Sequence, residues 1–144
     1  MIKFQIAEIG NKTYFDKFGL TYWGVPAYNI GKNFHPKEED WLGYLIQFDG
    51  YNDKVLVYHA GDSDLIPEMK QLSEIDIALL PIGGNFTMNA GEAAKAVGII
   101  KPKIAVHMNY DSIEGVGEKS DAEIFAKNAG LLGIEVKILE KMRL

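Results

Sequence analysis

Two short apolar runs, Ile75–Ile82 and Lys103–Met108, lie in the second half of the sequence, and each is followed by a segment patterned for a helix. Apolar runs of this length are typical of strands buried on both faces. Asn89 and Glu92 have the spacing of a helix-capping box, and Pro102 stops that helix. Ser120 and Glu123 repeat the box for a helix that Gly130 closes. The pattern predicts parallel strands joined by helices.

The first sixty residues are patterned for strands instead. Leu20–Tyr28, Trp41–Phe48 and Lys54–Tyr58 are rich in aromatic and branched residues, and Met1–Ile6 alternates weakly. Asp49-Gly50 between two of these runs is a hairpin signal. The fold class is therefore α/β, a mixed β-sheet with helices on one face, in a single domain over residues 1–144.

The apolar strands also predict an interaction surface. If helices cover one side of the sheet, the other apolar side needs a cover, and an uncovered one marks a docking face. We therefore expect a homodimer, with two sheets packed about 10 Å apart. The alternative is that the aromatic-rich first 28 residues fold over that face.

Charge and cysteine content narrow the class of protein. The net charge of −5 provides no basic surface for nucleic acid. No apolar run approaches the roughly 20 residues that cross a membrane. The absence of cysteine excludes disulfides and thiolate metal sites and favours a reducing, cytoplasmic location.

Several separated motifs, in order, resemble one family of enzymes. They are Val25-Pro26-Ala27-Tyr28-Asn29, Phe34-His35-Pro36-Lys37, the strand and turn from Val55 to Asp64, the segment from Ala78 to Met88, and Lys101-Pro102-Lys103. Together they are similar to the metallo-β-lactamase superfamily, in the branch that includes ascorbate-6-phosphate lactonase-like proteins.

The resemblance implies a four-layer αββα sandwich, of which this chain would be the C-terminal half. It also implies a metal-dependent hydrolase, usually with one or two zinc ions, acting on phosphodiesters, lactones, thioesters or amides. In that family the first half contributes a His-x-His-x-Asp-His motif. The second half contributes the aspartate of a Gly-Asp turn, here Asp62, and a histidine after a late strand.

The sequence departs from this pattern in its histidines. Only His35, His59 and His107 are present, so the His-x-His-x-Asp-His motif is missing. Asn109 stands where the late histidine is expected, and an amide oxygen is a poor zinc ligand. Catalytic zinc needs three protein ligands and an open position, so this chain alone is expected to be inactive.

The candidate metal ligands are Asp62, His107 and His35, whereas His59 is interpreted as structural. His107 lies two residues before Asn109, so strand alternation would direct both to one face. Because the other histidines are missing, we expect Asp62 to stabilise its turn by bonding backbone amides.

The candidate substrate-binding residues are Gly83, Gly84 and Asn109. The two glycines lie between a strand and a helix, where backbone amides can hold a phosphate; a tight connection explains them equally well.

Three functions remain open. In the first, the chain is part of a hydrolase whose first half is a separate chain or is missing from this sequence. In the second, it is a non-catalytic binding or assembly module that self-associates through the open sheet face. In the third, a remodelled metal site uses Asp62, His107 and His35 from two copies.

Overall fold

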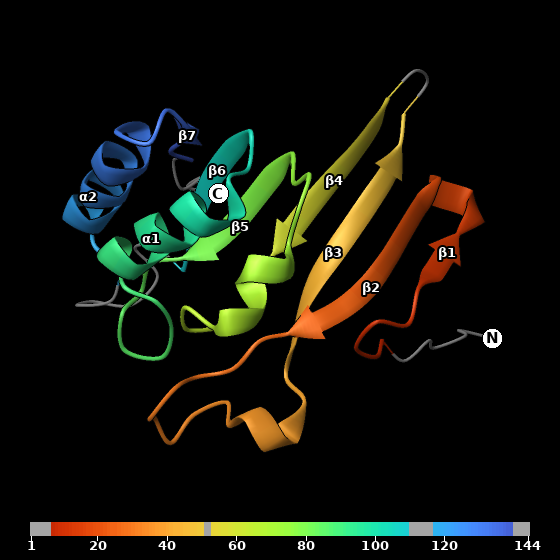
Figure 1. Cartoon of the computed structure of the whole chain (residues 1–144), viewed down its shortest axis with the longest axis horizontal. Coiled ribbons are helices and arrows are strands. Elements are labelled where there is room, and N and C mark those ends of the chain that lie inside the picture. The colour runs from red at the N-terminus through yellow and green to blue at the C-terminus, as the bar shows by residue number, and fades with distance from the viewer. Residues whose placement is uncertain (1–6, 51–52, 110–116, 140–144) are drawn as a thin grey trace, which may run out of the picture.

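The computed structural model describes residues 7–50, 53–109 and 117–139, which form one mixed seven-stranded sheet in the order β1-β2-β3-β4-β5-β6-β7 (Figure 1). The strand expected at Met1–Ile6 lies outside the described residues. The α/β class with a mixed sheet is confirmed.

The first four strands are antiparallel. They are β1 (Thr13–Phe15), β2 (Leu20–Pro26), β3 (Leu42–Asp49) and β4 (Lys54–His59). Short 3-10 turns follow β1 and precede β3, namely η1 (Asp16–Phe18) and η2 (Lys37–Glu39). The hairpin expected at Asp49-Gly50 joins β3 to β4, and the Gly50 amide bonds the Asp53 carbonyl at its base. β1 was not expected from the sequence.

The second half is built from parallel strands and helices. They are η3 (Pro67–Gln71), β5 (Ile77–Pro81), α1 (Ala90–Ile100), β6 (Ile104–Met108), α2 (Lys119–Gly130) and β7 (Glu135–Lys137). η3 is a short 3-10 helix with Pro67 in its first turn. Both α-helices lie at the β5–β7 end of the sheet (Figure 1).

Each of the two α-helices begins at a capping box. Asn89 and Glu92 make both hydrogen bonds of the expected capping box at α1. The box expected from Ser120 and Glu123 is two residues out of place, because Glu118 and Asp121 form it at α2.

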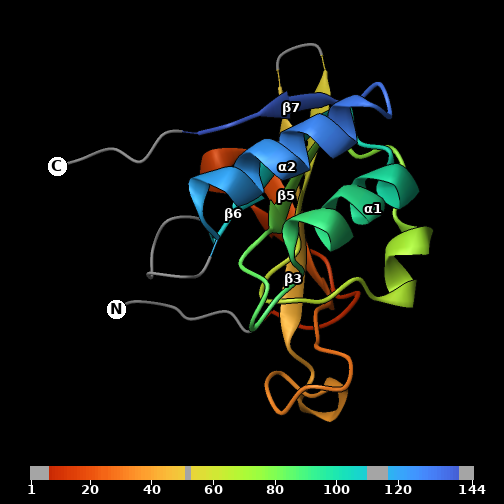
Figure 2. The same ribbon diagram turned by 90° about the vertical axis from the view of Figure 1, so that its left-hand side faces the viewer.

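The two faces of the sheet differ in burial. Tyr58, Ala78, Leu80 and Ala105 face the helices and are at most 1% exposed. Figure 2 shows α1 and η3 together on one side of β3 and β5. The residues that alternate with them point to the other side and are mostly half-buried; they include Val57, Ile77, Leu79 and Ile104.

The structure therefore has an apolar sheet face that no described helix covers. Residues 13–26 do not fold across it, since β1 and β2 extend the sheet sideways instead. No helix of the described residues is long and apolar enough to cross a membrane.

Candidate metal half-site

Three of the residues selected from the sequence meet where loops leave the sheet. Asp62 lies in the turn after β4, His35 in the loop between β2 and β3, and Asn109 directly after β6. The Asn109 side-chain nitrogen donates to Asp62 Oδ1 at 2.8 Å. His35 Nε2 lies 3.9 Å from Asp62 Oδ2. Asp62, half exposed at 52%, thus has an amide on one oxygen and an imidazole near the other.

His35 is oriented by Asn29 and Trp41. Its Nδ1 lies 3.1 Å from the Asn29 side-chain oxygen, and its ring packs edge-on against Trp41 with centroids 5.1 Å apart. A carbonyl oxygen can only accept, so Nδ1 is the donor in this contact and Nε2 is the nitrogen that faces Asp62. This is the arrangement by which an outer hydrogen bond fixes a metal-ligating histidine.

Asn29 contributes a second feature to this loop. It is 6% exposed, and its side-chain nitrogen has no hydrogen-bond partner among the described residues. Its backbone amide bonds the His35 carbonyl, which closes the loop on itself. Asn29 belongs to one of the motifs that carry the resemblance, but its contact with His35 was not predicted from the sequence.

The Gly61-Asp62 turn depends on close backbone packing. Gly61 has φ of +66°, and a Cβ there would lie 2.8 Å from the Leu42 carbonyl oxygen. The Gly61 amide donates to His59 Nδ1 at 3.1 Å. His59 is therefore structural, as expected, and its task is to hold this turn.

Asp62 itself does not behave as a turn-stabilising residue. Within the described ranges its carboxylate accepts no backbone amide, and its one hydrogen bond comes from Asn109. The expectation that Asp62 bonds backbone amides is wrong. The physical reason is that the left-handed Gly61 directs Asp62 outward, towards the loops that carry His35 and Asn109.

Asp64 takes the anchoring role instead. Its carboxylate accepts the Ile30 amide at 2.9 Å and the Lys32 ammonium at 2.6 Å. Lys32 also donates to the Thr87 carbonyl at 3.1 Å. These bonds join the loop that carries His35 to the Asp62 turn and to the loop before α1. Lys32 and Asp64 were missed because their pairing spans 32 residues and has no local signature.

His107 is not brought to the cluster. Its ring is 4% exposed and packs edge-on against Phe125 of α2, and burial lowers the pKa of its imidazole. The expected shared face of His107 and Asn109 is not formed, because β6 ends at Met108 and Asn109 adopts a left-handed backbone with φ of 56°.

Gly83 and Gly84 begin the loop before α1, as expected, but that loop folds onto itself. Gly83 bridges to Asn89, and the Gly84 amide donates to the Met88 carbonyl at 3.0 Å. Gly84 also has φ of +85°. Since its amide is already bonded, a phosphate cradle here would lack that donor, so a tight connection accounts for Gly84.

The donor set fits one side of a zinc site. Zinc binds histidine nitrogen and carboxylate oxygen at about 2.0–2.2 Å, so two ligands of one tetrahedral ion lie roughly 3.4 Å apart. The 3.9 Å between His35 Nε2 and Asp62 Oδ2 is close to that separation. Among the described residues, however, no group of three or more His, Cys, Asp or Glu could hold a metal ion.

The chain is similar to a known protein family and to curated metal-dependent hydrolases. Residues 2–110 match the family model described as a beta-lactamase superfamily domain. A metal-dependent hydrolase from Thermococcus onnurineus (strain NA1) is 41% identical over 116 residues, which cover 78% of this chain and 49% of the relative. The chain spans about half the length of such curated relatives.

Two solved structures share the fold. The structure described as a metal-dependent hydrolase from Parabacteroides distasonis ATCC 8503 superimposes with a TM-score of 0.78 at 33% identity, over 97% of this chain and 59% of that one. Igni18, a metallo hydrolase from Ignicoccus hospitalis KIN4/I, has a TM-score of 0.72 at 29% identity, over 93% of this chain and 56% of its own.

Proposed function

Because this chain belongs to the beta-lactamase superfamily domain family, we propose that it forms one side of the metal site of a metal-dependent hydrolase. The observation that carries the proposal is the 3.9 Å approach of His35 Nε2 to Asp62 Oδ2. Both groups are good zinc ligands, and both are held by loops bonded to each other through Asp64 and Lys32.

The remaining ligands would come from another polypeptide segment. Catalytic zinc takes three protein ligands and keeps one position open, whereas this side supplies one carboxylate and one imidazole. The superfamily resemblance implies that the other ligands belong to a His-x-His-x-Asp-His motif, which this sequence lacks. The chain alone is therefore inactive as a hydrolase, and it becomes competent when that motif is brought to the same edge.

Each residue of the half-site has a separate task. Asp62 and His35 would hold the metal, Asn29 fixes the protonated nitrogen of His35, and Asn109 orients the Asp62 carboxylate. Asp62 and His35 would be two of the residues that hold zinc here, and the metal would supply an activated water as a nucleophile at neutral pH. The substrate class follows from the resemblance: a phosphodiester, lactone, thioester or amide.

The test is reconstitution. The part of the Thermococcus onnurineus relative that this chain does not match would be produced separately and mixed with this chain and zinc. We expect hydrolysis of bis(p-nitrophenyl) phosphate or a simple lactone only in the complete mixture, and its loss with Asp62→Ala. Zinc-dependent turnover by this chain alone would contradict the proposal, as would a mixed complex that binds no zinc.

The open sheet face supports a second candidate, a self-associating assembly module. Val57, Ile77, Leu79 and Ile104 share that face and are only half-buried in one copy. Apolar patches of this kind are rare on monomers. A homodimer packed sheet to sheet would bury them, and its existence does not require metal.

A further inference from the structure

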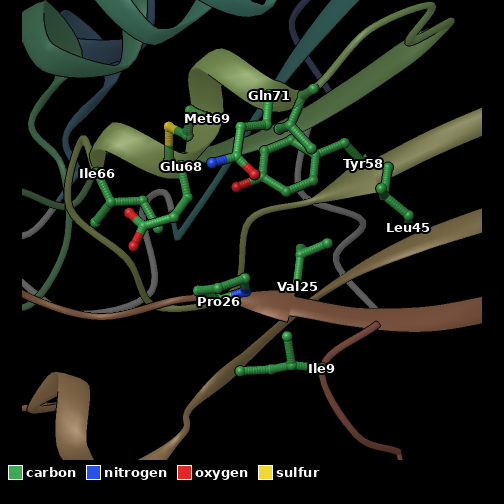
Figure 3. Close-up of a pocket in the computed structure, with 10 residues that line it drawn as sticks. Ile9, Val25, Pro26, Leu45, Tyr58, Ile66, Glu68, Met69 and Gln71 are labelled. Atoms are coloured by element: carbon green, nitrogen blue, oxygen red, sulfur yellow. The ribbon is translucent and has the colours of Figure 1, made fainter. Parts of the chain in front are cut away.

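A cavity of about 280 Å³ lies between the sheet and η3 (Figure 3). Three adjacent strands, β2, β3 and β4, form its floor. Its walls are mostly aliphatic side chains, among them Val25, Leu45, Ile66, Met69 and Leu72. Ile9 lies at its edge and is 46% exposed, so the cavity has an approach from solvent.

One polar group deep in this cavity is unexplained by the fold. Tyr58 is 1% exposed, and its hydroxyl makes no hydrogen bond to any residue that the structure describes. Figure 3 shows this hydroxyl pointing towards the end of the cavity where Glu68 and Gln71 lie. A hydroxyl that faces a cavity without a protein partner can still exchange a hydrogen bond with water or with a ligand there. Burial also raises the pKa of Tyr58 well above its ordinary value, so the group stays a neutral donor and acceptor.

The acidic residue beside it is already neutralised. Glu68 accepts the Tyr28 hydroxyl and the Lys37 ammonium, each at 2.8 Å. The hydrogen bond from Lys37 holds the pKa of Glu68 below its usual range. A ligand therefore meets an aliphatic pocket, the Tyr58 hydroxyl and the exposed Gln71 amide, with no free charge. An ion entering such a site would lose hydration without compensation.

We propose that this cavity binds a small uncharged organic molecule, with an apolar body and one hydroxyl or carbonyl oxygen hydrogen-bonded to Tyr58. The volume sets the size of the body: an apolar protein cavity of roughly 150 Å³ holds a benzene ring. The 280 Å³ here accommodates a ring with a short alkyl substituent and its oxygen. This site goes beyond the proposed hydrolase function, and none of its residues belongs to the Asp62, His35 and Asn109 cluster.

The test compares two probes that differ by one oxygen, 4-ethylphenol and ethylbenzene. Each is titrated into the isotope-labelled chain, and binding is followed by amide chemical shifts. We expect saturable shifts at Val25, Leu45 and Met69 for both probes. Tyr58→Phe should weaken 4-ethylphenol about three- to tenfold, as loss of one neutral hydrogen bond requires, and leave ethylbenzene within about twofold.

A second variant tests the cavity itself. Val25→Phe places a ring in the cavity and should abolish binding of both probes, with circular dichroism showing whether the fold is kept. Tyr58→Phe stays informative if Val25→Phe does not fold, because the Tyr58 hydroxyl has no partner to lose among the described residues. Absence of shifts at the cavity residues at millimolar probe, or equal affinity of wild type and Tyr58→Phe for 4-ethylphenol, would overturn the proposal.

Discussion

The side-chain amide of Asn109 donates a 2.8 Å hydrogen bond to the carboxylate of Asp62, joining the end of β6 to the turn after β4. Parallel strands β4, β5 and β6 bring these two ends to one edge of the sheet, although 47 residues separate them. Asn109 thus stands beside Asp62, where the superfamily resemblance places a histidine. Compared with the residues that the resemblance implies, an amide replaces an imidazole beside the Asp62 carboxylate.

The first prediction follows from that change. Asn109→His would add an imidazole to Asp62 and His35, which makes three zinc ligands on one side. We expect zinc affinity, measured by isothermal titration, to rise at least about tenfold. Hydrolysis of bis(p-nitrophenyl) phosphate by this variant alone should stay at background, because all three ligands lie on one side of the site and the segment that would enclose the metal on the other side is still missing. Enzyme-like turnover would contradict the prediction.

The second prediction concerns Asp62 and stability. Asp62 is 52% exposed and holds no backbone amide within the described ranges, so Asp62→Ala removes little packing or bonding. We expect the free energy of unfolding in urea to change by less than about 0.5 kcal/mol. Any zinc-induced rise in the melting temperature of the wild type should vanish, since a ligand stabilises only the state that binds it. A loss of 2 kcal/mol or more would point to a structural role instead.

Much of the fold could be predicted from the sequence, because the patterns that indicate its strands, turns and helix caps are local. The doubly apolar runs, the capping box at Asn89 and the Asp49-Gly50 turn each depend on neighbours within a few residues. The start of α2 was misplaced by two residues, because the pattern favoured Ser120 and Glu123 whereas Glu118 and Asp121 form the capping box. β1 was missed because its three residues carry too weak a pattern.

The site was less accessible, because its contacts join distant segments. Asp62, His35 and Asn109 were selected through motifs, and the structure brings them together. His107 was also selected, by assuming that strand alternation continues to Asn109. That assumption fails where β6 ends, since one left-handed residue redirects the chain. The pairing of Lys32 with Asp64, which holds the loops together, was not predicted because the two residues lie 32 positions apart.

A third prediction uses the acid dependence of Asp76. Its carboxylate accepts the Leu56 amide and the Lys103 ammonium, each at 2.7 Å, and these two bonds hold its pKa below the ordinary 3.8. We expect Asp76→Ala to lower the free energy of unfolding at neutral pH by roughly 1–3 kcal/mol, because the Leu56 amide loses its partner.

The pH profile of that difference has a definite sign. A carboxyl whose pKa is lower in the folded state stabilises the fold above its ordinary pKa, and the effect is lost as pH falls through the folded pKa. The difference in the free energy of unfolding between wild type and Asp76→Ala should therefore be constant above about pH 5 and shrink below about pH 4. Lys103→Met is the control; the Lys103 side chain is 79% exposed, so its removal should change stability little. A gap that widens in acid would refute this account.

The fourth prediction tests self-association. We expect this chain to sediment at twice its monomer mass at micromolar concentration. Leu79→Glu, in the middle of the open apolar face, should give a folded monomer, because a carboxylate cannot be buried there without a partner. Leu131→Glu is the matched control, since Leu131 follows α2 and is 79% exposed. A wild-type monomer, or equal effects of the two substitutions, would rule out the sheet face as the interface.

The final prediction separates two glycines with the same backbone conformation. Gly61 and Gly31 have φ of +66° and +67°, but an added Cβ would meet the Leu42 carbonyl oxygen at 2.8 Å only at Gly61, whereas nothing lies within 4 Å at Gly31. Gly31→Ala should cost about 1 kcal/mol, the strain of a left-handed alanine. Gly61→Ala carries the same strain plus a backbone clash that no side-chain rotation relieves, so it should cost at least about 1 kcal/mol more. Because the clash must shift the turn, Gly61→Ala should also weaken zinc binding through Asp62, while Gly31→Ala should not. Urea unfolding with and without zinc measures both effects. Equal losses in the free energy of unfolding for the two variants would contradict the prediction, because they would show that the backbone around Gly61 shifts at little cost to make room for the Cβ.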